Sequence, residues 1–315
     1  MIFTTLVLLA GLTLLIISGD FLVRGASSLA LRMHISTLVV GLTVVAFGTS
    51  APELFVSIRA ALEGTPDIAT GNVVGSNICN LALVLGVTSL IRPIQVHRDS
   101  VKIDWPVTMG ASLLLFGIMQ GGEISFWEGA LFVVLLILYV VFLIRKSRKE
   151  HISRQALQDV VEVALPSNAI WKDVLFLALG VAGLYFGSEW FVGSARELAG
   201  YLGVTERVIS ITVVAVGTSL PELVTSVIAS FKRESDLAIG NLLGSNIFNI
   251  FSILGFTSLI KEVAVNDTIL GVDMLWMLSI TLLVLPMMIS KRVITRLEGG
   301  VLLSTYIVYT YFVIS

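Results

Sequence analysis

The sequence predicts an all-α, polytopic membrane protein in which ten transmembrane helices form two inverted five-helix repeats. Three observations lead to this fold class. Hydrophobic residues make up 56% of the 315-residue chain and charged residues only 13%, whereas about a quarter of a soluble domain is charged. The apolar residues are gathered in runs long enough to cross a bilayer. In addition, two sequence blocks occur twice at the same spacing.

The apolar runs divide into ten expected spans, each near the ~20 residues that a helix needs to cross the hydrocarbon core. A membrane β-barrel requires alternating polar and apolar positions, and unbroken apolar runs such as residues 131–144 exclude it. The first run lacks the basic segment and the cleavage site of a signal peptide, so we expect it to be retained. The spans are 2–22, 36–60, 71–91, 105–121, 125–144, 171–192, 207–230, 240–260, 271–290 and 297–314.

A charged connector separates the first five spans from the last five, which places both chain ends on the side opposite the connector. With this arrangement 16 of the 20 Lys and Arg residues lie on the connector's side. Basic residues favour the cytoplasmic side of a membrane. We therefore expect a plasma (inner) membrane protein with both termini outside, built from a first repeat at 1–145, a cytoplasmic linker at 146–170 and a second repeat at 171–315.

The repeated blocks reveal the internal symmetry. TVVAFGTSAPEL and GNVVGSNICN at 43–54 and 71–80 recur as TVVAVGTSLPEL and GNLLGSNIFN at 212–223 and 240–249, which is a shift of 169 positions in both cases. Because each half has an odd number of spans, the second copy crosses the membrane in the opposite direction. Inverted repeats are typical of secondary transporters, whose substrate site lies near mid-membrane where the repeats meet.

Each copy places a glutamate, Glu53 or Glu222, directly after a proline in an apolar span. Proline removes a backbone donor and weakens the helix, so carbonyl groups of the preceding turn are freed. Hydroxyl and amide side chains share the same helical faces as the glutamates or lie on the next span. These are Thr49, Ser50, Ser76 and Asn80 in the first copy and Thr218, Ser219, Ser245 and Asn249 in the second.

An all-oxygen set of this kind suits hard cations such as Ca²⁺, which takes about 6–8 oxygen ligands. Softer metals require His or Cys, but the three histidines lie outside the spans and Cys79 is the single cysteine. An ionised carboxylate at the bilayer centre costs at least about 2.5 kcal/mol. Two glutamates therefore predict a cationic substrate, with protonation as the alternative when no cation is bound.

Two further pairs of polar residues accompany the motifs. Asn72 and Asn241 could act as ligands, but we expect them to cap the helices of the third and eighth spans. Thr43 and Thr212 are expected to hydrogen-bond back to their own helices. A purely structural role for one buried glutamate is the simplest alternative for the site, and the duplication of the motif argues against it.

With these motifs the sequence resembles the cation/Ca²⁺ exchanger superfamily, in particular its prokaryotic Na⁺/Ca²⁺ exchanger branch, whose repeats carry G-T-S-x-P-E and G-S-N-x-x-[ND]. The resemblance covers nearly the whole chain. It implies eight helices gripping the ion sites, with the first and sixth spans sliding across them. The implied Ca²⁺ ligands are Glu53, Glu222, Thr49 and Thr218. The implied Na⁺ sites use Ser50, Ser76, Ser219, Ser245 and the carbonyls of Ala46 and Ala215, with Asn80 and Asn249 lining the centre.

Asn249 departs from the pattern of many relatives, including the K⁺-dependent exchangers, which carry Asp at this position. The resemblance then implies an exchanger that does not need K⁺. The expected function is a secondary antiporter that expels Ca²⁺ against inward Na⁺. Ca²⁺ and Na⁺ are its substrates in the lipid bilayer, and no cofactor, nucleic acid or obligate protein partner is expected.

Other functions remain open at this point. The nearest alternative is a Ca²⁺/H⁺ exchanger, since the same carboxylates could carry protons, although the Ser and Thr residues around them favour Na⁺. A cation channel is disfavoured by the inverted halves. An enzyme, such as an intramembrane protease with paired acids, is disfavoured because the G-x-G-D pattern is absent.

Overall fold

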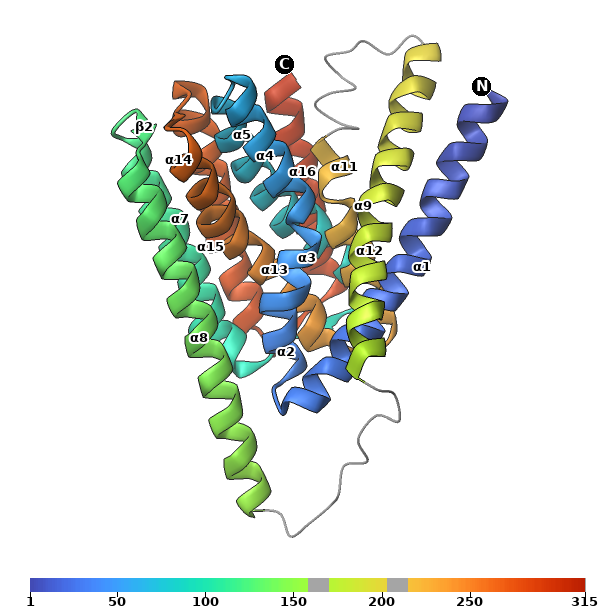
Figure 1. Cartoon of the computed structure of the whole chain (residues 1–315), viewed down its shortest axis with the longest axis vertical. Coiled ribbons are helices and arrows are strands. Elements are labelled where there is room, and N and C mark those ends of the chain that lie inside the picture. The colour runs from blue at the N-terminus through green and yellow to red at the C-terminus, as the bar shows by residue number, and fades with distance from the viewer. Residues whose placement is uncertain (158–169, 203–214, 315) are drawn as a thin grey trace.

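The computed structural model describes residues 1–157, 170–202 and 215–314, which are mostly helical (Figure 1). The helices run roughly along one direction, and both chain termini lie at the same end of the molecule. The first half contains α1 (Ile2–Met33), α2 (Thr37–Val40), η1 (Gly41–Val45), α3 (Ala46–Thr49), α4 (Ala51–Glu63), α5 (Asp67–Ile78), η2 (Cys79–Val84), α6 (Leu85–Ile91), η3 (Ser100–Asp104), α7 (Trp105–Met119) and α8 (Phe126–Leu157).

The second half contains the corresponding elements. They are α9 (Ile170–Tyr201), α11 (Ala215–Thr218), α12 (Leu220–Phe231), α13 (Ser235–Phe248), η5 (Asn249–Leu254), α14 (Gly255–Ile260), η6 (Ile269–Asp273), α15 (Met274–Ile289) and α16 (Arg296–Ile314). The segments labelled η are π-helical. Such turns are rare and often occur at functional sites, and here η5 begins at Asn249 while η2 contains Asn80.

The helices confirm an integral, multi-pass membrane protein. Among the described residues, seven helices are long and apolar enough to cross a bilayer. The helices Thr37–Thr49 and Ala51–Glu63, which meet at a bend of 44°, make an eighth span when they are counted as one. The seven are Ile2–Met33, Ile68–Ile91, Ser100–Met119, Phe126–Glu150, Ile170–Tyr201, Ser235–Ile260 and Ile269–Ile289. Part of the predicted span 207–230 lies outside the described residues, and α16 covers the predicted span 297–314.

Two short antiparallel sheets join the halves. β1 (Ile94–Gln95) pairs with β4 (Val293–Ile294), and β2 (Glu123–Ile124) pairs with β3 (Val263–Ala264). β2 lies at the end of the molecule that carries both termini, whereas β4 directly precedes α16, which runs from the opposite end toward the C-terminus (Figure 1). Residues 124 and 293, which correspond in the repeat, therefore lie toward opposite ends of the molecule.

The core lies around α13, and α1 and α9 pack against each other at one edge (Figure 1). Every residue from Leu237 to Gly255 is buried. The α1–α9 contact depends on glycine: a Cβ at Gly180 would lie 2.8 Å from the backbone nitrogen of Leu22. α1 continues well past its predicted end at residue 22, and Arg32 in this extension binds Asp173 of α9 at 2.5 Å.

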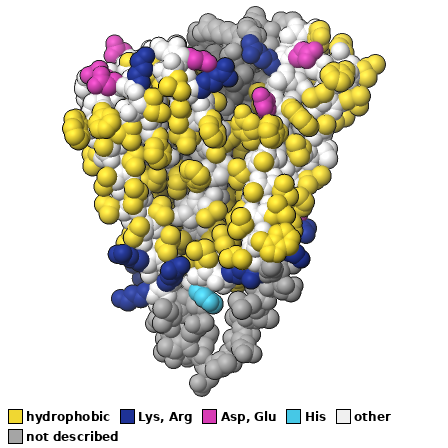
Figure 2. Space-filling model, viewed as in Figure 1, with side chains coloured by type: hydrophobic (Ala, Val, Ile, Leu, Met, Phe, Trp, Pro, Cys, Tyr) yellow, Lys and Arg dark blue, Asp and Glu magenta, His cyan; other side chains and the backbone are white. Residues whose placement is uncertain are grey.

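The surface is that of a membrane protein. Figure 2 shows hydrophobic side chains in a broad band between two ends that carry the charged residues. On this face the acidic side chains gather toward the end with the termini, and basic side chains occur at both ends. Exposed apolar side chains in the band are stable only against lipid, because a soluble protein rarely exposes so large an apolar area.

Candidate cation site

Each predicted glutamate lies in the first turn of a helix that follows a break. Ser50 separates α3 from α4 with φ −85° and ψ 2°, and Pro52 and Glu53 follow in α4. Ser219 separates α11 from α12 with φ −92° and ψ 8°, followed by Pro221 and Glu222. A proline is tolerated in the first turn, where its missing N–H group is not needed. The positive end of the helix dipole there favours a nearby carboxylate.

The two glutamates come from different halves of the chain and meet inside the protein. Both Glu53 and Glu222 are fully buried, with 0% of their surface exposed, and their carboxylates are near enough to repel each other. Ser50 donates a hydrogen bond to Oε1 of Glu222 over 3.2 Å, and Ser245 donates to the same oxygen over 3.4 Å. A side chain of the first copy therefore contacts the carboxylate of the second.

Thr49 extends this contact between the halves. Its Oγ1 lies 3.1 Å from Oδ1 of Asn241, 3.3 Å from Oγ of Ser245 and 3.3 Å from the carbonyl oxygen of Ala46. Ala46 O also accepts the backbone N–H of Ser50 at 3.0 Å. The predicted residues Thr49, Ser50, Glu222 and Ser245 thus form one hydrogen-bonded group across the repeat interface.

Several buried side-chain oxygens in this region have no hydrogen-bond partner among the described residues. Buried polar groups are nearly always paired in native proteins, and an unpaired one costs about 1–3 kcal/mol. Hard cations bind such oxygens, so the donor set fits an ion like Ca²⁺ or Na⁺. The unpaired oxygens are both carboxylate oxygens of Glu53, Oε2 of Glu222, Oδ1 of Asn80, Oδ1 of Asn249 and Oγ of Ser219.

The remaining predicted residues lie on the same elements. Ser76 on α5 is buried, and Thr218 at the end of α11 is half-buried. Ala215 is the first described residue of α11. The prediction for Thr43 is confirmed, since its hydroxyl donates to the carbonyl of Val39 at 2.6 Å, whereas Thr212 lies outside the described residues.

The expected capping role of Asn72 and Asn241 is wrong. α5 begins at Asp67 and α13 at Ser235, so both asparagines lie inside their helices. Nδ2 of Asn72 donates to the carbonyl oxygen of Glu53 at 3.2 Å and to Oγ of Ser57 at 3.0 Å. Packing against the neighbouring helix, rather than the helix terminus, determines its partners.

Asn241 makes the equivalent contacts in the second copy. Its Nδ2 donates to the carbonyl oxygen of Glu222 at 3.5 Å and to Oγ of Ser226 at 3.1 Å. Each partner is 169 positions from its counterpart in the first copy. In both halves, therefore, an asparagine fixes the backbone of the residue that carries the buried carboxylate.

Sequence reasoning did not single out Asn77 and Asn246, the asparagines of the two Gly-Ser-Asn motifs. Nδ2 of Asn77 donates to the carbonyl oxygen of Asn246 at 3.3 Å. Oδ1 of Asn77 accepts from Nδ2 of Asn249 at 3.1 Å. Asn77 therefore orients the amide of Asn249 across the interface. The signal that could have identified it was its presence in both copies.

A multi-pass helical fold with buried carboxylates and neutral oxygens between two repeats defines a membrane transporter for small cations. The model of the family described as "Sodium/calcium exchanger protein" matches residues 3–145 and 172–315. The chain belongs to this family, whose members are exchangers rather than enzymes, and it is a cation/Ca²⁺ antiporter.

Individual relatives cover the whole chain. CaxA of Alkalimonas amylolytica is 38% identical over 100% of both chains. The sodium/calcium exchanger MaX1 of Methanosarcina acetivorans is 35% identical over 96% of both. Among solved structures, the sodium–calcium exchanger NCX_Mj soaked without Na⁺ and Ca²⁺ superposes with a TM-score of 0.84, at 30% identity and over 99% of both chains.

Proposed function

We propose that this protein expels Ca²⁺ from the cell in exchange for Na⁺, by alternating access at a site formed by Glu53 and Glu222. The observation that carries the proposal is the pair of buried carboxylates, one from each half, with carboxylate oxygens that lack partners among the described residues. Two negative charges balance one Ca²⁺ or two Na⁺. The two ions then compete for the same pair, which couples their movements.

The ligands are assigned from the donor set and from the likeness to sodium/calcium exchangers. Glu53 and Glu222 bind Ca²⁺, and Thr49 and Thr218 complete its shell. The hydroxyl groups and freed carbonyls beside them bind Na⁺, and two amides line the centre. These are Ser50, Ser76, Ser219, Ser245, Ala46 and Ala215 for Na⁺ and Asn80 and Asn249 for the centre.

The architecture assigned to this function is ten transmembrane helices in two inverted repeats, at 1–145 and 171–315. The linker at 146–170 is cytoplasmic and both termini are outside, in the plasma (inner) membrane. Similar contacts within each half support the repeat. Besides the asparagine contacts, Tyr139 donates to Asp104 at 3.2 Å in the first half, and Tyr309 donates to Asp273 at 3.1 Å in the second.

The coupling ion is assigned as Na⁺ because hydroxyl oxygens surround the carboxylates. Ser50, Ser245 and Thr49 lie within 3.4 Å of Glu222 or of each other. A hard cation needs such a shell, whereas a proton could be carried by the carboxylates alone. Ca²⁺/H⁺ exchange is the competing function.

Uptake of ⁴⁵Ca²⁺ into proteoliposomes separates the two functions. Vesicles loaded with Na⁺ and diluted into Na⁺-free buffer are compared with vesicles loaded at acid pH without Na⁺. Uptake driven by the Na⁺ gradient and unaffected by the pH gradient is the expected result. Uptake driven only by the pH gradient would assign the site to protons.

Potassium is expected to have no effect on exchange. Nδ2 of Asn249 donates to Oδ1 of Asn77, so a carboxylate at this position would face an acceptor rather than a donor. The centre then holds only the two charges of Glu53 and Glu222. Replacement of K⁺ by choline on both sides of the vesicles should leave the Na⁺-driven ⁴⁵Ca²⁺ flux unchanged. A flux that requires K⁺ would contradict this.

Asn72 is expected to act as a positioning residue. Its alanine variant loses the donor to the Glu53 carbonyl, and groups that orient a metal ligand typically contribute about 10–100-fold to affinity. We expect the KM for Ca²⁺ to rise about tenfold, with a smaller change in kcat. Asn266→Ala is the matched control, because Asn266 lies in an exposed loop, where its Oδ1 accepts a hydrogen bond from the backbone N–H of Thr268. An unchanged KM in Asn72→Ala would show that its role is purely structural.

A further inference from the structure

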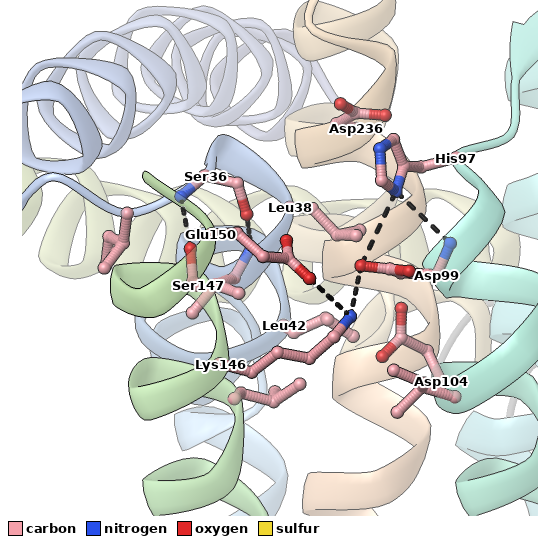
Figure 3. Close-up of a pocket in the computed structure, with 14 residues that line it drawn as sticks. Ser36, Leu38, Leu42, His97, Asp99, Asp104, Lys146, Ser147, Glu150 and Asp236 are labelled. Atoms are coloured by element: carbon pink, nitrogen blue, oxygen red, sulfur yellow. Dashed lines mark hydrogen bonds and ion pairs between the residues drawn. The ribbon is translucent and has the colours of Figure 1, made fainter. Parts of the chain in front are cut away.

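A second group of charged side chains lies away from the glutamates, at the end of the molecule opposite the termini (Figure 3). They line a cavity of about 170 Å³, which we call the loop-side pocket. One water takes about 30 Å³ in the liquid, so the cavity has room for a cation with several water molecules. The charged and titratable residues that line it are Asp99, Asp104, Asp236, Glu150, Lys146 and His97.

The loop-side pocket is strongly acidic. Lys146 on α8 forms an ion pair with Asp99 and lies 3.3 Å from Oε1 of Glu150. Nδ1 of His97 lies 4.0 Å from Oδ2 of Asp99. With all four carboxylates ionised, the one ammonium leaves a net charge of −3 when His97 is neutral, and −2 when it is protonated. The field in the pocket therefore attracts a cation.

Asp104 at the bottom of the pocket also favours a bound cation. Its surface is only 1% exposed. Oδ1 accepts a hydrogen bond from Tyr139 at 3.2 Å, and Oδ2 has no hydrogen-bond partner among the described residues. Figure 3 shows the carboxylate turned toward Lys146 and Asp99, into the pocket. An unpaired oxygen buried in this way is costly, and a ligand that donates to it removes the cost.

The spacing of the acids indicates which cation fits. Within the described ranges, no group of three or more His, Cys, Asp or Glu side chains could hold a metal ion, so an ion in the pocket would have at most two such side chains as direct ligands. Ca²⁺ needs about 6–8 direct oxygen ligands, whereas Mg²⁺ gives up its water reluctantly and is usually bound through one or two carboxylates. We propose that the loop-side pocket binds a hydrated Mg²⁺ ion, held at Oδ2 of Asp104 and, through its waters, by Asp236.

The pocket is repeated only in part, whereas the residues of the glutamate site occur in both copies. Asp104 and Asp236 correspond to Asp273 and Asp67 in the other half. His97 and Asp99, in contrast, correspond to Asn266 and Thr268. Residues lining the pocket come from α2, η1, η3, α8 and α13 and from the segments just before α2 and η3. An ion held by Asp104 and Asp236 would therefore join η3 to α13, the helix that carries Ser245.

The test measures binding in a protein whose transport site is silenced. Full-length Glu53→Gln/Glu222→Gln protein in nanodiscs is titrated with Mn²⁺, a paramagnetic probe for Mg²⁺ sites, and free Mn²⁺ is followed by electron paramagnetic resonance. We expect one bound Mn²⁺ per chain, displaced by Mg²⁺ at lower concentrations than by Ca²⁺. Because no flux is measured, the result does not depend on the proposed exchange.

Two variants and a matched control locate the site. Asp104→Asn retains an acceptor for Tyr139, and Asp236→Asn changes a half-buried residue, so both should fold. Each is expected to weaken Mn²⁺ binding at least about tenfold. Asp273→Asn removes the carboxylate equivalent to Asp104, which Tyr309 contacts outside this pocket, and should bind normally. No Mn²⁺ binding, better displacement by Ca²⁺, unchanged binding in both pocket variants or an equal loss in Asp273→Asn would each overturn the proposal.

Discussion

Replacement of either Glu53 or Glu222 by glutamine is expected to reduce Na⁺-driven Ca²⁺ flux at least about 100-fold, which corresponds to about 2.7 kcal/mol. A unit charge a few ångströms from a divalent ion interacts with it by more than this even when the effective dielectric constant is about 20. Glutamine keeps the shape and the acceptor oxygen of the side chain but not its charge. The variants should therefore lose Ca²⁺ binding while the hydrogen bonds from Ser50 and Ser245 to position 222 remain possible.

The folded state should not suffer from these substitutions. Both carboxylates are fully buried, and an ionised group in the membrane interior lowers stability when no cation is bound. The Tm of each glutamine variant without ions should be equal to or above that of the parent protein. Glu63→Gln, on the same helix but exposed and paired with Arg59, is the control and should transport normally. Full Ca²⁺ flux in Glu53→Gln or Glu222→Gln would disprove the site assignment.

Gly244→Ala is expected to have the second large effect, on stability and transport together. A Cβ at Gly244 would lie 2.8 Å from Cα of Leu42, 2.9 Å from its carbonyl oxygen and 2.8 Å from Cβ of Ala46. Real Cβ atoms almost never approach backbone so closely, so α13 would have to move away from η1 and α3. Overpacking a core typically costs about 1–3 kcal/mol. The same movement would pull Ser245 away from Thr49, which lies 3.3 Å from it.

The measurement for Gly244→Ala is its thermal unfolding in detergent together with its ⁴⁵Ca²⁺ flux per folded protein. A lower Tm and a reduced flux are the expected results. Gly110→Ala is the control: Gly110 is exposed on α7 with no described atom within 4 Å of an added Cβ, and alanine favours a helix over glycine by about 1 kcal/mol. A Gly244→Ala protein with normal Tm and flux would show that α13 can move away from η1 and α3 without loss of stability.

The sequence was sufficient to predict a helical, multi-pass membrane protein, because apolar runs of span length have few other stable arrangements in lipid. It also predicted the paired glutamates, since a proline beside a carboxylate in an apolar run is unusual and occurs twice. Helix ends were less predictable. α1 continues to Met33 because its extension packs on α9, where Arg32 binds Asp173, and hydropathy carries no information about that contact.

The apolar spans, the helix breaks just before Pro52 and Pro221, and the repeat could all be predicted from short stretches of sequence. Which distant groups contact one another became known only from the packing of the helices. Asn72 binds the Glu53 carbonyl instead of capping a helix, and Asp104, Lys146 and Asp236 share one pocket. The physical reason is that local periodicity specifies which face of a helix is apolar. The partner of a polar atom on that face depends on how all the helices pack.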